Sequence, residues 1–227
     1  MIYTPLITVA RRLGELRERV VFVGGMVRGL LITDEAASPF RPTDDVDLIV
    51  GVESRVGYAR LSKELRALGF REDAAEGAPL CRWIVEGIHV DVMPDDGKIL
   101  GFSNAWYASA LATPLTATIG DEAIRIIDAP HFCATKLEAF GDRGRGDFYH
   151  HDLEDVVAVV DGRAELADEL GRADGSLRSY VSRSIAALLS ARAFIEALPG
   201  HLPGDTGSQR RLPMLEARLR GLAGLPP

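Results

Sequence analysis

The sequence predicts an α/β (α+β) protein in which a small mixed sheet is followed by a helical region. Two observations lead to this fold class. Short apolar segments with strand-like patterning alternate with helical patterns over the first 128 residues. From residue 129 onward, the apolar residues recur at helical spacing. We therefore expect a core domain over residues 1–128 and a C-terminal helical domain over residues 129–227.

The core domain is expected to alternate helices and strands along the chain. A hairpin is predicted because two alternating apolar segments flank the dipeptide Glu86-Gly87. Gly69 is expected to end the helix before it, since glycine favours the end of a helix. In order, we expect a helix (5–19), a strand (20–23), a helix (26–33), a strand (45–50), a helix (57–68), the hairpin strands (80–86 and 88–93) and a weaker strand (123–127).

The helical region is expected to begin with a capped helix. Asp128 suits the cap and Pro130 the first turn, and the helix should end near Gly141. Residues 177–198 form the longest periodic stretch, and residues 199–213 contain turn residues that predict an exposed connection before a last short helix.

Length, charge and cysteine content indicate a compact protein. The chain has 227 residues, of which 47% are hydrophobic, enough to bury a core. A net charge of −7 argues against a protein that coats nucleic acid non-specifically. Only two cysteines are present, Cys81 and Cys133, which suits a reducing compartment. Arg11 and Arg12 interrupt the N-terminal segment before any sustained apolar run, so we expect a cytoplasmic protein with no membrane partner.

Three aspartates stand within the predicted strands. Asp45 and Asp47 are two residues apart, so they share one face of their strand. Asp91 lies between Val90 and Val92 in the second hairpin strand. Each could simply face solvent at a strand end. Together, carboxylates on neighbouring strands would suit Mg²⁺ or Mn²⁺, which prefer oxygen ligands.

Two glycines follow the first strand. Gly24 and Gly25 lack a Cβ, so the backbone can turn sharply there and approach a phosphate closely. The helix after them would direct its N-terminal amides at such an anion. An ordinary tight turn explains the pair equally well when it is considered alone. The order strand, Gly-Gly, helix and Asp-x-Asp strand instead brings turn and carboxylates to one sheet edge.

This pattern resembles the nucleotidyltransferases of the DNA polymerase β type. The resemblance implies that Asp45, Asp47 and Asp91 hold two divalent ions, Mg²⁺ or Mn²⁺, during transfer of a nucleotide from a nucleoside triphosphate. It also implies that Gly24 and Gly25 contact the nucleotide. The segment between Gly25 and Asp45 is longer than is usual in that superfamily.

Residues 128–163 resemble the signature of the AbiEii/AbiGii toxin-like nucleotidyltransferases. This resemblance implies that Lys136 contacts the triphosphate and that Asp152 is the acid required beside it. Asp155 would share a helix face with Asp152. His151 precedes Asp152, where an arginine often stands in the family. The resemblance further implies that the protein is the toxin of a toxin–antitoxin pair and that its partner is an antitoxin protein.

Two other function classes remain open. The segment 24–31, GGMVRGLL, resembles the opening of tRNA CCA-adding enzymes, which implies that Arg28 joins the glycines in binding the nucleotide. Gly29 stands where those enzymes carry an acid, and antibiotic nucleotidyltransferases share a similar Gly-Gly and Asp-x-Asp. The remaining class is a non-catalytic nucleotide-binding regulatory protein. Three clustered carboxylates argue against that class, because clustered charge is costly to keep.

RNA such as tRNA is one candidate acceptor, and a protein or a small molecule stays open as an alternative. The phosphates of RNA would have to meet arginines in a chain of net negative charge, which predicts binding that weakens steeply with salt. Candidate docking residues are Arg11, Arg12, Arg17, Arg19, Arg143, Arg145, Arg210, Arg211, Arg218 and Arg220. A solvated helix face explains the two terminal arginine stretches without any ligand. His150 and His151 could suggest a metal, but no further His or Cys cluster completes a zinc set.

Overall fold

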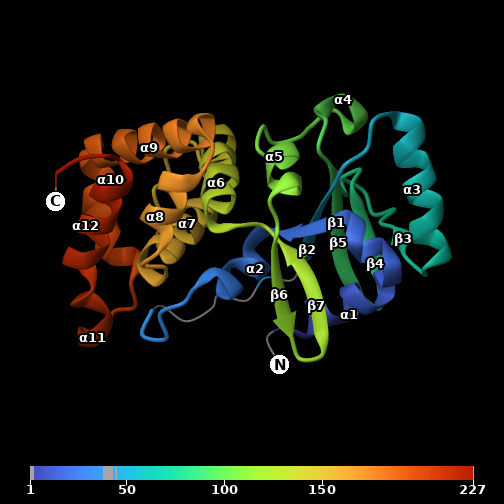
Figure 1. The fold of residues 1–227 in the computed structure, drawn as a ribbon, viewed down its shortest axis with the longest axis horizontal. Helices are drawn as coiled ribbons and strands as arrows, with labels where there is room; N and C mark the ends of the chain where they lie inside the picture. Colours follow the sequence, from blue (N-terminus) through green and yellow to red (C-terminus); the bar gives the residue numbers. More distant parts are fainter. Residues whose placement is uncertain (1–2, 38–42, 44, 227) are drawn as a thin grey trace. The chain divides into compact units, whose positions relative to one another are not determined.

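The computed structural model describes residues 3–37, 43 and 45–226. The chain forms two compact units (Figure 1). The first comprises Met1–Val27 and Arg41–Asp128, and the second comprises Arg28–Phe40 and Ala129–Pro227. The segment 28–40, which the sequence assigned to the core domain, therefore belongs with the helices.

The first unit is built on a seven-stranded mixed sheet in the order β3-β4-β5-β2-β1-β7-β6 (Figure 1). β2 is parallel to β5 and β1 is parallel to β7, while the other neighbours are antiparallel. The predicted fold class is thereby confirmed. The strands are β1 (Val20–Val23), β2 (Asp45–Val50), β3 (Arg71–Glu72), β4 (Arg82–Val85), β5 (Ile88–Pro94), β6 (Leu115–Ile119) and β7 (Glu122–Ile126).

The helices of this unit differ in places from the prediction. The expected helix over residues 5–19 is wrong beyond Leu13, because Gly14 adopts φ 53° and a 3-10 turn follows. Ser54 caps the helix over residues 55–67 by accepting from the Gly57 amide at 3.1 Å. The helices are α1 (Thr4–Leu13), η1 (Gly14–Arg19), α3 (Arg55–Ala67), α4 (Gly97–Leu100) and α5 (Tyr107–Ala112).

Strand β6 was not predicted. Its five residues, LTATI, are mostly exposed, so the apolar alternation that marks a half-buried strand is absent. It pairs with β7 across a turn in which Gly120 has φ 61°. The structure thus gives the weak strand at residues 123–127 an antiparallel partner.

Apolar side chains cover one whole face of the central strands β2 and β5. Val46 and Leu48 of β2, with Val90 and Val92 of β5, are at most 1% exposed. Helix α1 packs on β2 and β7, and the Tyr58 hydroxyl of α3 donates to the Val92 carbonyl at 2.9 Å. The alternate residues of these strands point to the other face.

The second unit is helical (Figure 1). α6 packs on α7 and α9, and α12 packs on α7 and α9 as well. The expected helix over residues 177–198 is interrupted, since Ala191 is extended at φ −88° and ψ 110°. The elements are α6 (Ala129–Arg143), α7 (His151–Gly162), α8 (Leu166–Arg172), α9 (Gly175–Ser190), α10 (Arg192–Ala197), η2 (Leu198–His201), α11 (Thr206–Gln209) and α12 (Leu212–Leu222).

Helix α2 (Gly24–Leu31) connects the two units along the chain, and the segment after it is fastened to the helices. The amides of Thr33 and Asp34 both donate to the Gly162 carbonyl, at 2.9 and 3.0 Å. Arg211 bonds Asp34 at 2.7 Å and the buried Asp161 at 2.9 Å. Within the described parts of the chain, no helix has both the length and the apolar character needed to cross a bilayer.

We predict that Arg211→Ala destabilises the protein by about 3–5 kcal/mol, because Asp161, at 1% exposed, would lose its charge partner. Chemical denaturation of the variant beside Arg210→Ala checks this, since Arg210 is its exposed neighbour. Equal losses in the two variants would contradict the role assigned to Arg211.

Candidate active site

The three predicted carboxylates converge on one face of the sheet. β2 and β5 are parallel, and Asp47 is in register with Asp91, two positions from the pair Asp45 and His89. Asp45, Asp47 and Asp91 each present a carboxylate oxygen, and these three oxygens lie within 4.8 Å of one another. Oxygen donors in this number suit a divalent cation such as Mg²⁺ or Mn²⁺.

Gly24 places the start of α2 beside this cluster. It follows Val23, which pairs with Asp47, and it adopts φ 74°. A Cβ on Gly24 would lie 1.8 Å from Oδ2 of Asp47, so any other residue would overlap the carboxylate. Gly25, the next residue of α2, is buried. The sequence therefore needs glycine at position 24 for both its backbone angle and its close approach to Asp47.

Arg82 of β4 lies at the same cluster. It faces Asp91 directly across the β4–β5 pair. Its Nε and Nη2 donate to the two oxygens of Asp91 at 2.8 and 2.7 Å, and Nη2 also reaches Asp45 at 3.4 Å. These hydrogen bonds to Asp91 raise the pKa of Arg82, so the guanidinium stays charged.

A second charged cluster joins α6 to α7 in the helical unit. Lys136 Nζ lies 3.1 Å from Asp152 and 2.7 Å from Asp155. Arg143 donates to both oxygens of Asp152, at 2.7 and 2.9 Å. Asp152 and Asp155 are fully buried and share one face of α7, as their spacing predicted. Arg143 orients Asp152, although the sequence motif offered no arginine just before it.

Arg28 belongs to this second cluster as well. Its side chain is 3% exposed, and Nη1 donates to Asp155 at 3.0 Å. The role of Arg28 in binding the nucleotide stays a prediction, and the structure shows that its guanidinium balances the charge of Asp155. A buried carboxylate needs such partners, because an isolated charge is costly to bury.

Two histidines, His150 and His151, directly precede Asp152. His150, His151 and Asp152 offer ligand atoms within 4.8 Å of one another, a grouping that sequence analysis set aside because no zinc set was complete. Asp152 already bonds the cations of Lys136 and Arg143, which oppose a metal ion at the same oxygens. Burial lowers the pKa of His151, which favours its neutral form.

Asp152 is ionised in spite of its burial. Burial alone would raise its pKa, but the hydrogen bond from Arg143 and the charge of Lys136 hold the pKa below its ordinary value. In this cluster, the buried carboxylate of Asp152 is balanced by the cations of Lys136 and Arg143.

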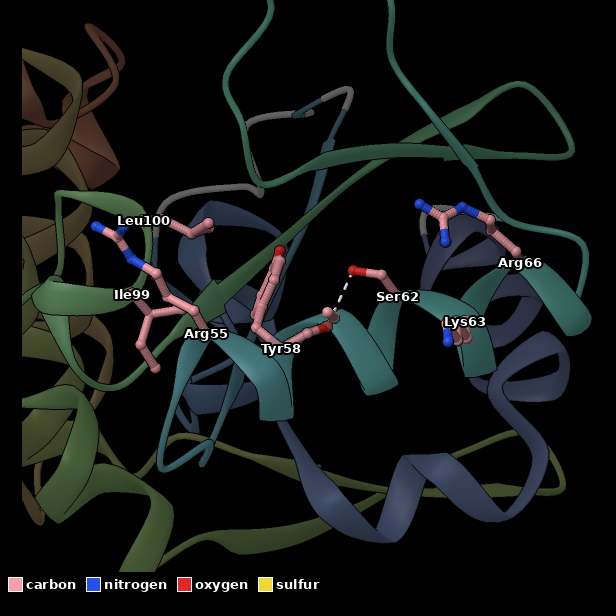
Figure 2. A pocket seen from close by; sticks show the side chains of 8 residues that line it. Arg55, Tyr58, Ser62, Lys63, Arg66, Ile99 and Leu100 are labelled. Atoms are coloured by element: carbon pink, nitrogen blue, oxygen red, sulfur yellow. Dashed lines mark hydrogen bonds between the residues drawn. The ribbon is translucent and has the colours of Figure 1, made fainter.

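A separate groove lies on α3 and α4, with a volume of about 380 Å³ (Figure 2). Several of its polar groups bond within the protein: Ser62 donates to the Tyr58 carbonyl at 3.0 Å, and Arg66 bonds Glu72. None of its lining residues is a carboxylate, so it offers no metal ligands. The lining residues are Arg55, Tyr58, Ala59, Ser62, Lys63, Arg66, Ile99 and Leu100.

Arg82 and Arg143 are the site residues that the sequence analysis did not assign to these clusters. The position of Arg82 beside Asp91 could have been predicted from the sequence of the hairpin turn. The two-residue turn at Glu86-Gly87, with φ 49° and 80°, fixes the hairpin register and sets Arg82 opposite Asp91. The pairing of Arg143 with Asp152 depends on how the loop returns from α6 to α7, which has no short-range signal.

Comparison with known proteins supports the fold. No protein-family profile matches the chain, and no curated protein matches it either. Among solved structures, the chain is similar to an antigenic nucleotidyltransferase-like protein from Paracoccidioides brasiliensis. The TM-score is 0.56 at 18% identity, covering 88% of this chain and 92% of that chain. The two proteins therefore share a fold.

We predict that Gly24→Ala is more destabilising than Gly69→Ala. Both glycines have positive φ, which costs an alanine about 1–2 kcal/mol. Only Gly24 also meets a side chain, since an added Cβ at Gly69 has nothing within 4 Å. The overlap with Asp47 adds about 1–3 kcal/mol. Urea unfolding of both variants measures the difference; an equal loss would show that Asp47 can move aside freely.

We predict that Asp152→Asn lowers the free energy of unfolding at pH 7 by about 3 kcal/mol, because two cations lose a buried partner. The folded-state pKa of Asp152 lies below the ordinary 3.8, so its stabilisation is present above pH 3.8 and is lost as pH falls through the folded-state pKa. Denaturation at a series of pH values should show a constant difference between the two proteins above pH 3.8, and this difference should shrink as the pH falls below 3.8. Asp142→Asn, an exposed change on α6, is the control.

Proposed function

We propose that the protein is a metal-dependent nucleotidyltransferase, which moves a nucleotide from a nucleoside triphosphate to an acceptor. The observation that carries this proposal is the convergence of Asp45, Asp47 and Asp91 beside Gly24. The nucleotidyltransferase-like fold supports it.

The carboxylate cluster fits a divalent cation. Its three oxygen donors lie within 4.8 Å of one another, and carboxylate oxygens are the ligands that such ions prefer. Asp45, Asp47 and Asp91 would hold Mg²⁺ or Mn²⁺. When bound, the metal would activate the attacking hydroxyl and offset the charge of the triphosphate.

The chain's own groups would position the nucleotide. The close approach of Gly24 to Asp47 leaves no side chain between the start of α2 and the carboxylates. The free amides at a helix N-terminus favour an anion, so the triphosphate would lie against Gly24 and Gly25. The reacting phosphate would then be adjacent to the carboxylates that hold the metal.

In this proposal Lys136 contacts the triphosphate, and Asp152 holds the lysine in place. The support is the resemblance to the AbiEii-like signature and the bonds from Lys136 to Asp152 and Asp155. Lys136 is 12% exposed, so a small part of its side chain is accessible. Lys136 is the donor in this pair, and Asp152 is a positioning residue.

We further propose that the protein is a cytoplasmic toxin whose partner is an antitoxin, and that its acceptor is tRNA or another RNA. The resemblance to the toxin-like family supports the toxin role, and the buried free thiols of Cys81 and Cys133 suit a reducing compartment. The N-terminal arginines do not form an open basic strip: Arg11 and Arg17 both pair with Glu122. Exposed Arg145 and Arg210 are therefore the better candidates to meet RNA phosphates.

Transfer of label tests the proposal. The purified protein is incubated with Mn²⁺ or Mg²⁺, each α-labelled nucleoside triphosphate in turn, and total RNA or protein. We expect metal-dependent labelling that falls at least about 100-fold in Asp47→Asn, since a metal ligand supplies several kcal/mol to the reaction. Asp121→Asn, an exposed change of the same charge, should keep full activity. Label transfer that does not require Asp47 would refute the assigned site.

The acceptor is identified in the same assay. RNA labelling that falls steeply between low and physiological salt supports the RNA proposal, because phosphate contacts release counterions. Label confined to protein or to a small molecule, with a shallow salt dependence, rejects it. Addition of C and A residues at tRNA 3′ ends would instead indicate a CCA-adding activity.

A further inference from the structure

We propose that Arg82 is an intramolecular counter-cation of the carboxylate cluster, which a divalent metal must displace from Asp91 in order to bind. The inference rests on the metal site of the proposed function and adds a residue that regulates it. Arg82 would lower the affinity of the cluster for metal while it keeps the metal-free protein folded.

The register of the sheet holds Arg82 beside the carboxylate cluster. Arg82 stands directly opposite Asp91 on the neighbouring antiparallel strand, so both side chains project from the same face. The Glu86-Gly87 turn fixes that register. The placement of Arg82 at the cluster is therefore built into the backbone of the hairpin.

Arg82 forms hydrogen bonds with two of the three carboxylates. Arg82 engages both oxygens of Asp91, and through Nη2 it also reaches Asp45 on β2, beyond β5. One guanidinium thus spans two of the three carboxylates that would hold the metal. Asp91 is mostly buried, with its side chain 11% exposed, so both of its oxygens face this one cation.

The positive charge of Arg82 opposes the binding of a metal ion at the same carboxylates. A guanidinium and a divalent ion at the same oxygens repel each other strongly in a partly buried site. Metal binding therefore competes with the Arg82 pair, and the two cations are negatively coupled. Removing the guanidinium should raise metal affinity, although it also removes a charge that stabilises the metal-free fold.

Mn²⁺ binding to the full-length protein tests the proposal. Free Mn²⁺ is measured by electron paramagnetic resonance during titration of the wild type, Arg82→Ala, Arg82→Gln and Arg71→Ala. We expect the Mn²⁺ Kd to fall about tenfold in both Arg82 variants, a typical size for coupling between two bound groups. Arg71 is exposed on β3 and carries the same charge, so Arg71→Ala should stay within about twofold of the wild type.

Stability provides a second readout. Without metal, the Arg82 variants should melt at a lower temperature than the wild type, and Mn²⁺ should raise their Tm by more than it raises that of the wild type. This comparison holds even if Arg82→Ala is only partly folded, because Arg82→Gln keeps the side-chain stem and two donors.

The outcomes separate this inference from the proposed function. Mn²⁺ affinity that is unchanged or weaker in both Arg82 variants, with the wild type binding metal, overturns the role of Arg82 and leaves the metal site in place. Binding in none of the four proteins overturns the metal site and the inference together. Mn²⁺ binding by the two Arg82 variants, with none by the wild type or Arg71→Ala, would mean that Arg82 excludes the metal, and it supports the inference most strongly.

Discussion

The balance of charge around clustered carboxylates is the constraint on which both candidate clusters depend. Asp45, Asp47 and Asp91 are fixed on one face by the parallel register of β2 and β5. Their mutual repulsion is unfavourable unless a cation is present. In the protein alone, the cation is Arg82, and the sheet places it there as firmly as it places the acids. Metal binding, in this account, exchanges one cation for another at a site of fixed geometry.

The helical unit also contains clustered carboxylates, and several cations of the protein balance their charge. Asp152 and Asp155 are buried on α7. Their charges are balanced by Arg28 of α2 and by Lys136 and Arg143 of α6. Arg28 and Lys136 are themselves nearly buried, so this cluster is enclosed by protein on most sides. Such a network favours one arrangement of α6 against α7, since removing any member leaves a buried charge. In the proposed function, this network positions Lys136 for contact with the triphosphate.

Much of the sheet site could be predicted from sequence because its determinants are local. Period-two alternation gives the shared face of Asp45 and Asp47. The Gly-Gly after β1 predicted a close approach of the backbone to a phosphate, and the structure shows that Gly24 also lies close to the carboxylate of Asp47. The placement of Asp91 beside Asp47 needed one longer step, the parallel pairing of β2 with β5. That pairing follows from the fold class and has no signal in either strand alone.

The errors arise where tertiary context overrides local pattern. Arg28 follows the Gly-Gly motif closely, and nothing in that motif indicates its pairing with Asp155, 127 residues away. β6 lacks a buried face and so lacks the apolar alternation of a strand. The helix expected over residues 5–19 is interrupted by a single glycine with positive φ. None of these outcomes follows from the spacing of apolar residues, which is the main signal for secondary structure.

The most direct test of the account is to locate the metal. Crystals grown with Mn²⁺ and a non-hydrolysable nucleoside triphosphate should give an anomalous peak bounded by Asp45, Asp47 and Asp91, with the guanidinium of Arg82 withdrawn from Asp91. The account is contradicted by a peak at His150, His151 and Asp152 instead, or by a Mn²⁺ ion at the sheet cluster while both Arg82–Asp91 hydrogen bonds stay intact.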